Sequence, residues 1–89
     1  MVEQGQEVSV VVLVADGSEE MEAVITIDIL RRAQIKVTVA KVDGDGSNLQ
    51  CKMSRGVVIV ADTHLKEVYG LQMPSMVVVP GGLEGAVGL

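Results

Sequence analysis

Residues 8–40, VSVVVLVADGSEEMEAVITIDILRRAQIKVTVA, decide the fold of this chain. They open with a β-branched apolar run at 8–14 that the turn residues ADGS close, a pattern typical of a buried parallel strand. Ser18 stands where it can cap the amides of a following helix. The next residues place negative charge at the positive end of the helix dipole, which favours a helix here; they are Glu19, Glu20 and Glu22.

The end of this helix is marked by two cations. Arg31 and Arg32 fall in its expected last turn, where positive charge is favoured by the helix dipole. IKVTVA then begins a second strand at Ile35. Strand, helix and strand form a right-handed βαβ unit, which predicts an α/β doubly wound domain.

The rest of the chain supplies further strands but little helix. A polar, glycine-bearing loop at 41–56 is expected to lead, through a short hairpin, into the strand VVIV at 57–60. THLKEVYGL, at 63–71, has room for at most two helical turns, and MVVV at 76–79 is the last strand. This count of four strands and about one and a half helices leaves one face of a parallel sheet short of cover.

Composition excludes several classes of protein. The chain has 89 residues, one Tyr and no Phe or Trp, so its core is built from aliphatic side chains. Twelve acidic against seven basic residues disfavour nucleic acid as a partner. The longest apolar run is far shorter than the roughly 20 residues that a membrane helix needs. A single cysteine and the absence of a signal sequence favour the cytoplasm.

The predicted helix has more apolar surface than one buried face requires. Besides its core positions it carries a second stripe in which Asp28 and Arg32 form a favourable i,i+4 pair. This stripe fits either the interior of a larger domain or a subunit interface, and the two readings carry equal weight. The stripe consists of Met21, Ile25, Asp28 and Arg32.

The final stretch, MVVVPGGLEGAVGL at 76–89, carries the most suggestive site motif. Gly81 and Gly82 lack Cβ atoms, so their N–H groups can approach an oxyanion or anionic ligand closely. The carboxyl end of a parallel strand is also where open α/β sheets place ligands. A tight turn leaving the strand explains the same residues equally well, and a phosphate-binding module remains a third reading.

Three other candidates are weaker. Cys51 has Lys52 and Arg55 nearby, but it is expected in an inter-strand loop without a nucleophile elbow, so we interpret it as non-catalytic. His64 is the only histidine and is expected in the first turn of a short helix. With no metal-ligand spacing around it, no metal is predicted. DGDG, at 43–46, lacks the rest of a calcium loop.

Several motifs, taken together and in order, resemble one family. They are VVVLVADGSEEMEAVITIDILRRAQIKVTVAKV, then QC, SRGVVIVAD and VVVPGGLEGA, and they cover nearly all of residues 8–89. The combination is similar to the N-terminal half of the DJ-one/ThiJ/PfpI superfamily, closest to its parkinsonism-associated branch. Residues 8–89 are therefore expected to be the N-terminal part of one domain, and residues 1–7 a disordered or tag-like extension.

The resemblance implies a flavodoxin-like three-layer sandwich with a mainly parallel sheet, present here as its N-terminal half. It also implies a homodimer and a reactive cysteine held near an acidic side chain. The family's glutamate falls on Glu22, and the amides of its oxyanion site fall on Gly81 and Gly82. The nucleophilic cysteine and its histidine belong to the family's second half. Cys51 corresponds to a secondary, redox-sensitive cysteine near the dimer interface.

For interface residues we expect the helix stripe together with Arg55, which is either at the dimer seam or simply solvated. The chain is expected to be an N-terminal fragment, truncated or nicked after Leu89, that pairs with its C-terminal fragment and is inactive alone.

The activity implied is that of a cofactor-free cysteine hydrolase or lyase. Its substrates are glyoxal-type aldehydes or their protein adducts, as in a glyoxalase or deglycase. The alternatives are a non-catalytic redox-sensing chaperone responding to oxidative stress, or a member labelled as a thiamine-pathway thiazole monophosphate synthesis protein. The superfamily is also glutamine amidotransferase-like in fold.

Overall fold

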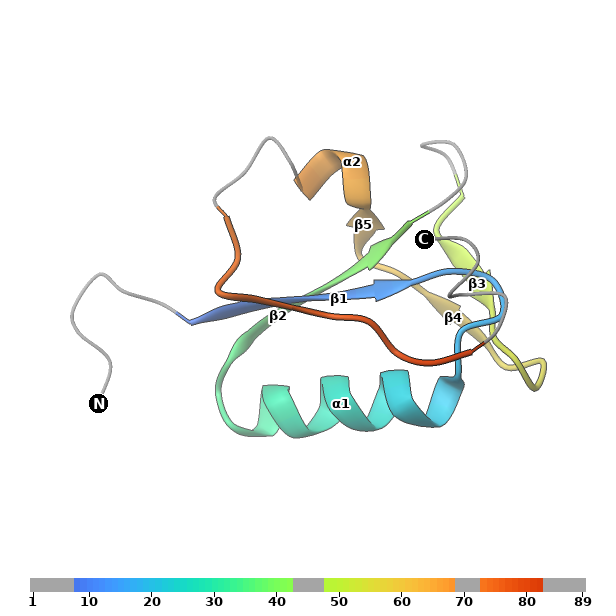
Figure 1. Cartoon of the computed structure of the whole chain (residues 1–89), viewed down its shortest axis with the longest axis horizontal. Helices are drawn as coiled ribbons and strands as arrows, with labels where there is room; N and C mark the ends of the chain where they lie inside the picture. The colour runs from blue at the N-terminus through green and yellow to red at the C-terminus, as the bar shows by residue number, and fades with distance from the viewer. Residues whose placement is uncertain (1–7, 43–47, 69–72, 83–89) are drawn as a thin grey trace.

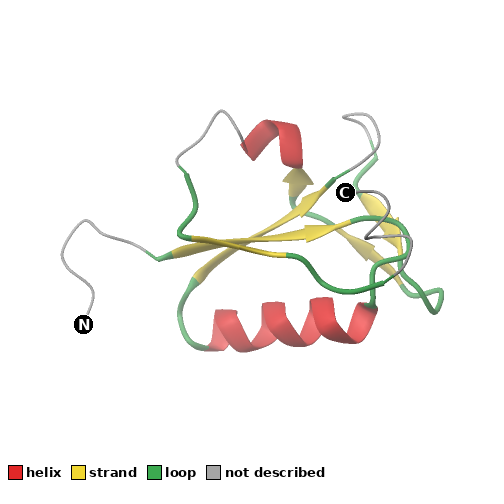
Figure 2. Ribbon diagram, viewed as in Figure 1, coloured by secondary structure: helices red, strands yellow, loops and turns green. Residues whose placement is uncertain are grey.

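A parallel sheet of four strands, in the order β5-β2-β1-β6, lies at the centre of the computed structural model (Figures 1 and 2). The structure describes residues 8–42, 48–68 and 73–82, so the expected N-terminal extension at 1–7 lies outside it. The elements are β1 (Ser9–Val14), α1 (Glu20–Arg32), β2 (Lys36–Lys41), β3 (Gln50–Lys52), β4 (Val58–Val60), β5 (Thr63–His64), α2 (Leu65–Val68) and β6 (Met76–Val78).

The predicted βαβ unit is confirmed. β1 and β2 pair in parallel over six residues, from Ser9 against Lys36 to Val14 against Lys41. β6 then pairs in parallel with the other side of β1. α1 lies across one face of the sheet and the short α2 on the other side (Figure 1). This is a mostly parallel α/β fold with helices on both sides.

The start of α1 differs from the sequence prediction. Glu19, not Ser18, is the N-cap, and its side chain accepts a hydrogen bond from the Glu22 amide. Ser18 instead accepts from the Ala15 amide at 3.0 Å and is buried in the turn that leaves β1. The chain turns sharply before the helix, at Gly17 with φ of 90°, so the side chain of Ser18 stabilises the turn and the cap falls one residue later.

The end of α1 is a Schellman motif built on an unusual residue. The Gln34 amide donates to the Arg31 carbonyl, and the Ile35 amide donates to the Leu30 carbonyl. Gln34 has φ of 66°, which is a left-handed conformation that glycine usually adopts at this position of a helix end. Leu30 and Ile35 both pack against the core, which supplies the hydrophobic contact that accompanies this motif. Arg31 and Arg32 lie in the last turn, as predicted.

The region after β2 holds two differences from the prediction. The expected hairpin is present, with β3 and β4 antiparallel, but β4 belongs to this hairpin and not to the parallel sheet. The fourth sheet strand is β5, whose Thr63 and His64 pair with β2. His64 is thus a buried strand residue that precedes α2. The described residues form six strands instead of four, because two very short strands carry too little pattern to be recognised.

The core lies between the sheet, α1 and the hairpin. Its largest fully buried side chains are Val12 and Val14 from β1 and Cys51 from β3. The prediction of a loop at Cys51 was therefore wrong: this side chain is fully buried in a strand and packs with the valines of the sheet. Ala23 is the residue of α1 that touches this core with no exposed surface, and the small side chain lets the helix approach the sheet.

Apolar surface remains exposed, as the inventory of elements predicted. β4 and β6 present half-exposed side chains, and α1 presents a stripe that the sheet does not cover. These residues are Val58, Val60, Met76, Val77, Met21, Ile25 and Ile29. The predicted i,i+4 pair of that stripe is confirmed, with Arg32 Nε 2.9 Å from Asp28 Oδ1. No helix within the described ranges is long and apolar enough to cross a membrane.

Candidate functional site

The order of the strands reverses between β1 and β6, which makes this the topological switch point of the sheet. From β1 the chain moves to β2 on one side, and β6 later returns to the other side of β1. Ligands in open α/β sheets bind beside the carboxyl ends of strands at such a reversal. The segments that leave β1 and β6 there are the turn at 15–19 and the loop Pro80–Gly81–Gly82.

Glu22 and Gly81, two residues singled out from the sequence, meet beside this switch point. The Gly81 amide donates a hydrogen bond of 2.6 Å to Glu22 Oε1, across 59 positions of sequence. A Cβ on residue 81 would lie only 2.9 Å from the same oxygen. A side chain at position 81 would push the flexible end of Glu22 away from the loop, so glycine lets the carboxylate lie this close. The resemblance had placed both residues at the site without predicting this bond.

The hydrogen bond between Gly81 and Glu22 affects the role that we predicted for the two glycines. An amide that donates to Glu22 is engaged, so Gly81 has to release the carboxylate before its N–H can face a substrate oxyanion. The geometry thus makes Gly81 a support for Glu22.

Gly82 is held against the turn that leaves β1. It has φ of 119°, and a Cβ there would clash with the Gly17 carbonyl and come within 2.9 Å of both Ser18 Cα and Glu19 N. In addition, the Glu19 amide donates to the Gly81 carbonyl at 2.7 Å. The glycine loop and the start of α1 are therefore packed backbone to backbone.

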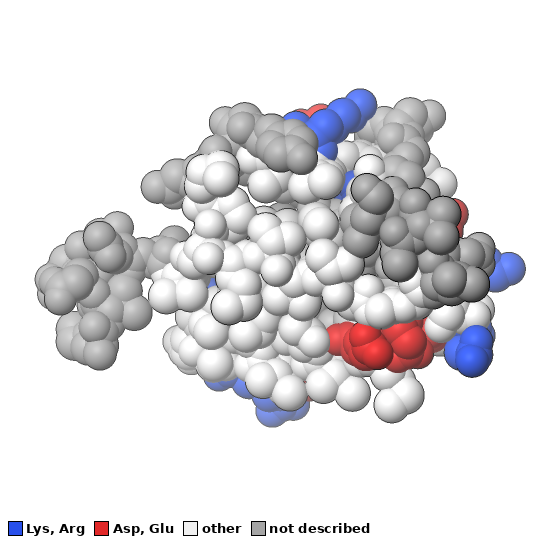
Figure 3. Space-filling model, in the orientation of Figure 1, with Lys and Arg blue, Asp and Glu red and all other residues white. Residues whose placement is uncertain are grey.

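An open groove runs beside this contact. It has a volume of about 460 Å³ and lies between α1 and the end of β6, with Glu22, Val78 and Pro80 among its walls. Figure 3 shows acidic side chains gathered at one place on this face of the molecule, over the N-terminal end of α1, while most of the face is uncharged. A carboxylate beside apolar walls is an arrangement suited to proton transfer at a small, uncharged substrate.

Glu20 has a place in the structure that sequence reasoning missed. We expected only a contribution to the helix dipole, but its carboxylate is buried and accepts from Ser54 Oγ at 2.7 Å and from the Arg55 amide at 2.9 Å. The hydrogen bond from Ser54, with smaller contributions from backbone amides, lowers the pKa of Glu20 from 4.5 to about 2. Its carboxylate thus ties α1 to the hairpin.

This lowered pKa predicts a dependence of stability on pH. Because the folded pKa lies below the unfolded one, the stabilisation by Glu20 is complete above pH 4.5 and disappears as the pH falls towards about 2. In urea unfolding of this chain, the midpoint should fall more steeply over that window for the wild type than for Glu20→Gln. The two curves should converge at the acid end, where both side chains are neutral.

A matched control is Glu67→Gln in α2, an exposed residue. This variant should keep the wild-type slope. Parallel curves for the wild type and Glu20→Gln across the window would show that the buried carboxylate carries no pH-dependent stability.

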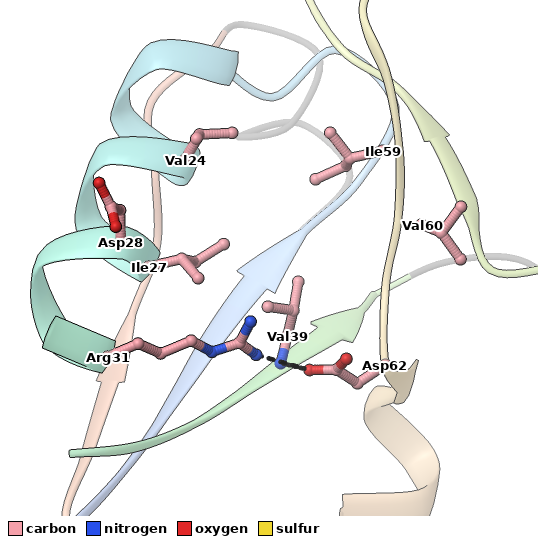
Figure 4. Close-up of a pocket in the computed structure, with 8 residues that line it drawn as sticks. All are labelled: Val24, Ile27, Asp28, Arg31, Val39, Ile59, Val60 and Asp62. Carbon is pink, nitrogen blue, oxygen red and sulfur yellow. Dashed lines mark hydrogen bonds and ion pairs between the residues drawn. The ribbon is translucent and has the colours of Figure 1, made fainter. Parts of the chain in front are cut away.

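A second groove, of about 400 Å³, separates α1 from the hairpin (Figure 4). Val24 and Ile27 of α1 face Ile59 across it, and the ion pair between Arg31 and Asp62, 3.2 Å long, lies at one end. Asp62 Oδ2 also accepts from the Val39 amide at 2.8 Å. The charged groups of that ion pair therefore serve the fold, and the Glu22 groove is the stronger candidate for chemistry.

Of the remaining predicted residues, Met21 and Ile25 are exposed on α1 and line the same groove as Glu22. Arg55 is exposed at the hairpin, where its amide binds Glu20. Cys51 lies in the core. Among the residues that the structure describes, no three His, Cys, Asp or Glu side chains gather as metal ligands do.

The fold and the contact between Glu22 and Gly81 together define a class: a flavodoxin-like α/β protein with a glutamate and a glycine loop at the switch point of its sheet. The comparisons with known proteins narrow the class further. The model of the DJ-1/PfpI family matches residues 8–89, and the chain belongs to this family. The resemblance seen in the motifs is confirmed.

Individual relatives support the same assignment. Protein dj-1beta of Drosophila melanogaster is 49% identical over 78 residues, which are 88% of this chain and 40% of that protein. The Parkinson disease protein 7 homolog of Danio rerio is 45% identical over 78 residues, again 88% of this chain and 40% of the relative. The chain therefore spans about two-fifths of the length of these curated relatives.

Solved structures agree. The crystal structure of Drosophila melanogaster DJ-1beta matches with a TM-score of 0.83 at 45% identity, over 92% of this chain and 42% of that one. Toxoplasma gondii DJ-1, in its oxidized form, matches with a TM-score of 0.83 at 42% identity, over 91% of this chain and 42% of that one.

Proposed function

We propose that this chain supplies the acidic half of a cysteine-dependent site that acts on glyoxal-type aldehydes or their adducts with proteins. The observation that carries the proposal is the carboxylate of Glu22, held by the Gly81 amide at the switch point of the sheet. The cysteine and histidine come from a C-terminal half like that of the relatives. This chain joined to or reassembled with such a half is called the completed domain below.

In the proposed reaction the thiolate attacks the aldehyde carbon. A carbon–sulfur bond forms, the electron pair of the carbonyl moves to its oxygen, and the first intermediate is a hemithioacetal. Glu22 takes the thiol proton and returns it to that oxygen, so no other reactant is needed for this step. For turnover, a proton moves from the former aldehyde carbon to the adjacent carbonyl carbon, which gives a thioester, and water hydrolyses the thioester to a 2-hydroxy acid and the free thiol. Gly82 stabilises the developing oxyanion through its amide. Gly81 fixes the carboxylate so that one oxygen stays directed at the thiol.

A second function is favoured by the oxidized state in which the Toxoplasma gondii relative was solved. On this proposal the domain is a redox sensor or chaperone: a peroxide oxidises the cysteine thiolate to a sulfenic acid and is itself reduced to water or an alcohol, and Glu22 hydrogen-bonds the oxidised sulfur. The same carboxylate serves both functions, which differ in whether the sulfur turns over or accumulates in its oxidised form.

The proposal also covers the binding partners of this chain and its location in the cell. The apolar stripe of α1, with Met21, Ile25, Asp28 and Arg32, is exposed in this chain and is the proposed surface for a second copy, together with the exposed Arg55 of the hairpin. Half-exposed valines of β6 are the proposed contact for the C-terminal half. The cytoplasm is the proposed location.

The experiment is to measure loss of methylglyoxal by the completed domain and, separately, by this chain alone. We expect turnover by the completed domain and none by the chain, since the nucleophile is supplied by the other half. A parallel titration with peroxide, read by intact mass, tests the second function. Stoichiometric oxidation without aldehyde turnover would favour the sensor, and turnover by this chain alone would contradict the shared site.

A further inference from the structure

The turn between β1 and α1 is hydrogen-bonded to the hairpin on one side. The Gly17 amide donates to the Lys52 carbonyl at 2.9 Å, and the Lys52 amide donates to Asp16 Oδ1 at 3.0 Å. The Ser54 amide donates to the Ser18 carbonyl at 2.9 Å. The hairpin is thus joined to three successive residues of the turn, through the backbone at Gly17 and Ser18 and through the side chain at Asp16.

The other side of the same turn carries the candidate site. The Glu19 amide binds the Gly81 carbonyl, and Glu22 binds the Gly81 amide. The first turn of α1 therefore lies between the hairpin and the glycine loop. Any change in its position changes the distance between the Glu22 carboxylate and the loop.

Glu20 is the side chain that fastens α1 itself to the hairpin. Both of its oxygens are used, one by Ser54 Oγ and one by the Arg55 amide, and the residue is 8% exposed. Glu20 and Glu22 share one helical turn, with a rise of about 1.5 Å per residue, so a displacement at one is transmitted to the other. Buried charge-assisted hydrogen bonds of this kind fix geometry strongly.

We infer that Glu20 is a positioning residue for Glu22: by anchoring the first turn of α1 to the β3–β4 hairpin, it fixes the Glu22 carboxylate against Gly81. This inference rests on the function proposed for Glu22. Glu20 itself faces the hairpin and takes no part in the chemistry. Its two partners lie 34 and 35 positions away, so the hairpin becomes a support of the site.

The test is the amide proton resonance of Gly81 in ¹⁵N-labelled completed domain. A carboxylate at 2.6 Å shifts this proton downfield, so the resonance reports the contact itself. In Glu20→Ala the resonance should move upfield. Ser54→Ala removes one of the two bonds without altering α1, so it should move the Gly81 resonance in the same direction by less. This variant replaces Glu20→Ala in the test if Glu20→Ala does not fold.

The matched control is Asp62→Asn. Asp62 accepts from Arg31 and from the Val39 amide, away from the first turn of α1, so its loss weakens the fold but should leave the Gly81 resonance in place. If Glu20→Ala and Ser54→Ala lower the melting temperature while the Gly81 resonance stays at its wild-type position, the inference is overturned.

Kinetics separate this inference from the function on which it rests. A misplaced carboxylate should lower kcat of the completed domain by roughly 10- to 100-fold with KM unchanged. If the resonance moves but Glu22→Ala retains full activity, the proposed function fails while the positioning of Glu22 by Glu20 stands. If Glu22→Ala is inactive and the resonance does not move, only the positioning fails.

Discussion

Gly82→Ala is expected to destabilise this chain by about 3–5 kcal/mol. Alanine at φ of 119° is strained in any surroundings. Here the added methyl also meets backbone atoms of Gly17, Ser18 and Glu19, none of which can rotate away. The loop has to withdraw from the turn, and the Gly81 bonds to Glu19 and Glu22 are lost with it.

Gly56→Ala is the matched control. Gly56 has φ of 94°, but a Cβ there would have nothing within 4 Å, so only the conformational strain of about 1–2 kcal/mol applies. Urea unfolding monitored by circular dichroism compares the two variants. Equal losses for Gly82→Ala and Gly56→Ala would mean that the close packing of the glycine loop on the turn does not exist in solution.

Glu22→Ala is expected to lower kcat/KM for methylglyoxal in the completed domain by about 10²- to 10³-fold. General acid–base catalysis by a positioned side chain contributes roughly 10²- to 10⁴-fold, and this variant removes the acid and leaves the Gly81 amide without its acceptor. The side chain is on the exposed side of α1, so stability should change little. Initial rates over a range of aldehyde concentrations measure the effect.

Glu22→Gln separates proton transfer by residue 22 from its hydrogen bond with the Gly81 amide. Glutamine keeps an acceptor oxygen for the Gly81 amide but cannot carry the proton, so Glu22→Gln should be as inactive as Glu22→Ala. Thr26→Ser, on the same groove but without an ionisable group, should retain near-wild-type rates. An active Glu22→Gln would contradict proton transfer by this residue.

The part of the fold that sequence could predict is the part set by local pattern. β1, α1 and β2 are adjacent in sequence, and each can be recognised from its own hydrophobic periodicity and from the turn or capping residues at its ends. The helix is marked in addition by acidic residues at its start and basic residues at its end. The two-residue β5 carries no such signal, and its pairing with β2 comes from tertiary contact. His64 was therefore assigned to the helix that it only precedes.

The candidate site likewise contains some features that the sequence could predict and others that it could not. Gly81 and Gly82 were recognisable from their place after an apolar run, and Glu22 from the resemblance to the family. In contrast, Glu19, Glu20 and Glu22 look alike in the run EEME, and their roles are decided by distant residues. Glu19 caps its own helix, Glu20 binds Ser54 and Arg55, and Glu22 binds Gly81. Only the packing of the hairpin and the glycine loop distinguishes them.

The most direct test of the shared site is a crystal structure of the completed domain in its reduced state. The account predicts that the sulfur of the reactive cysteine lies within hydrogen-bonding distance of one Glu22 oxygen while the Gly81 amide holds the other. A cysteine too distant for a direct or water-bridged contact with Glu22, or a Gly81 amide bonded elsewhere, would contradict it.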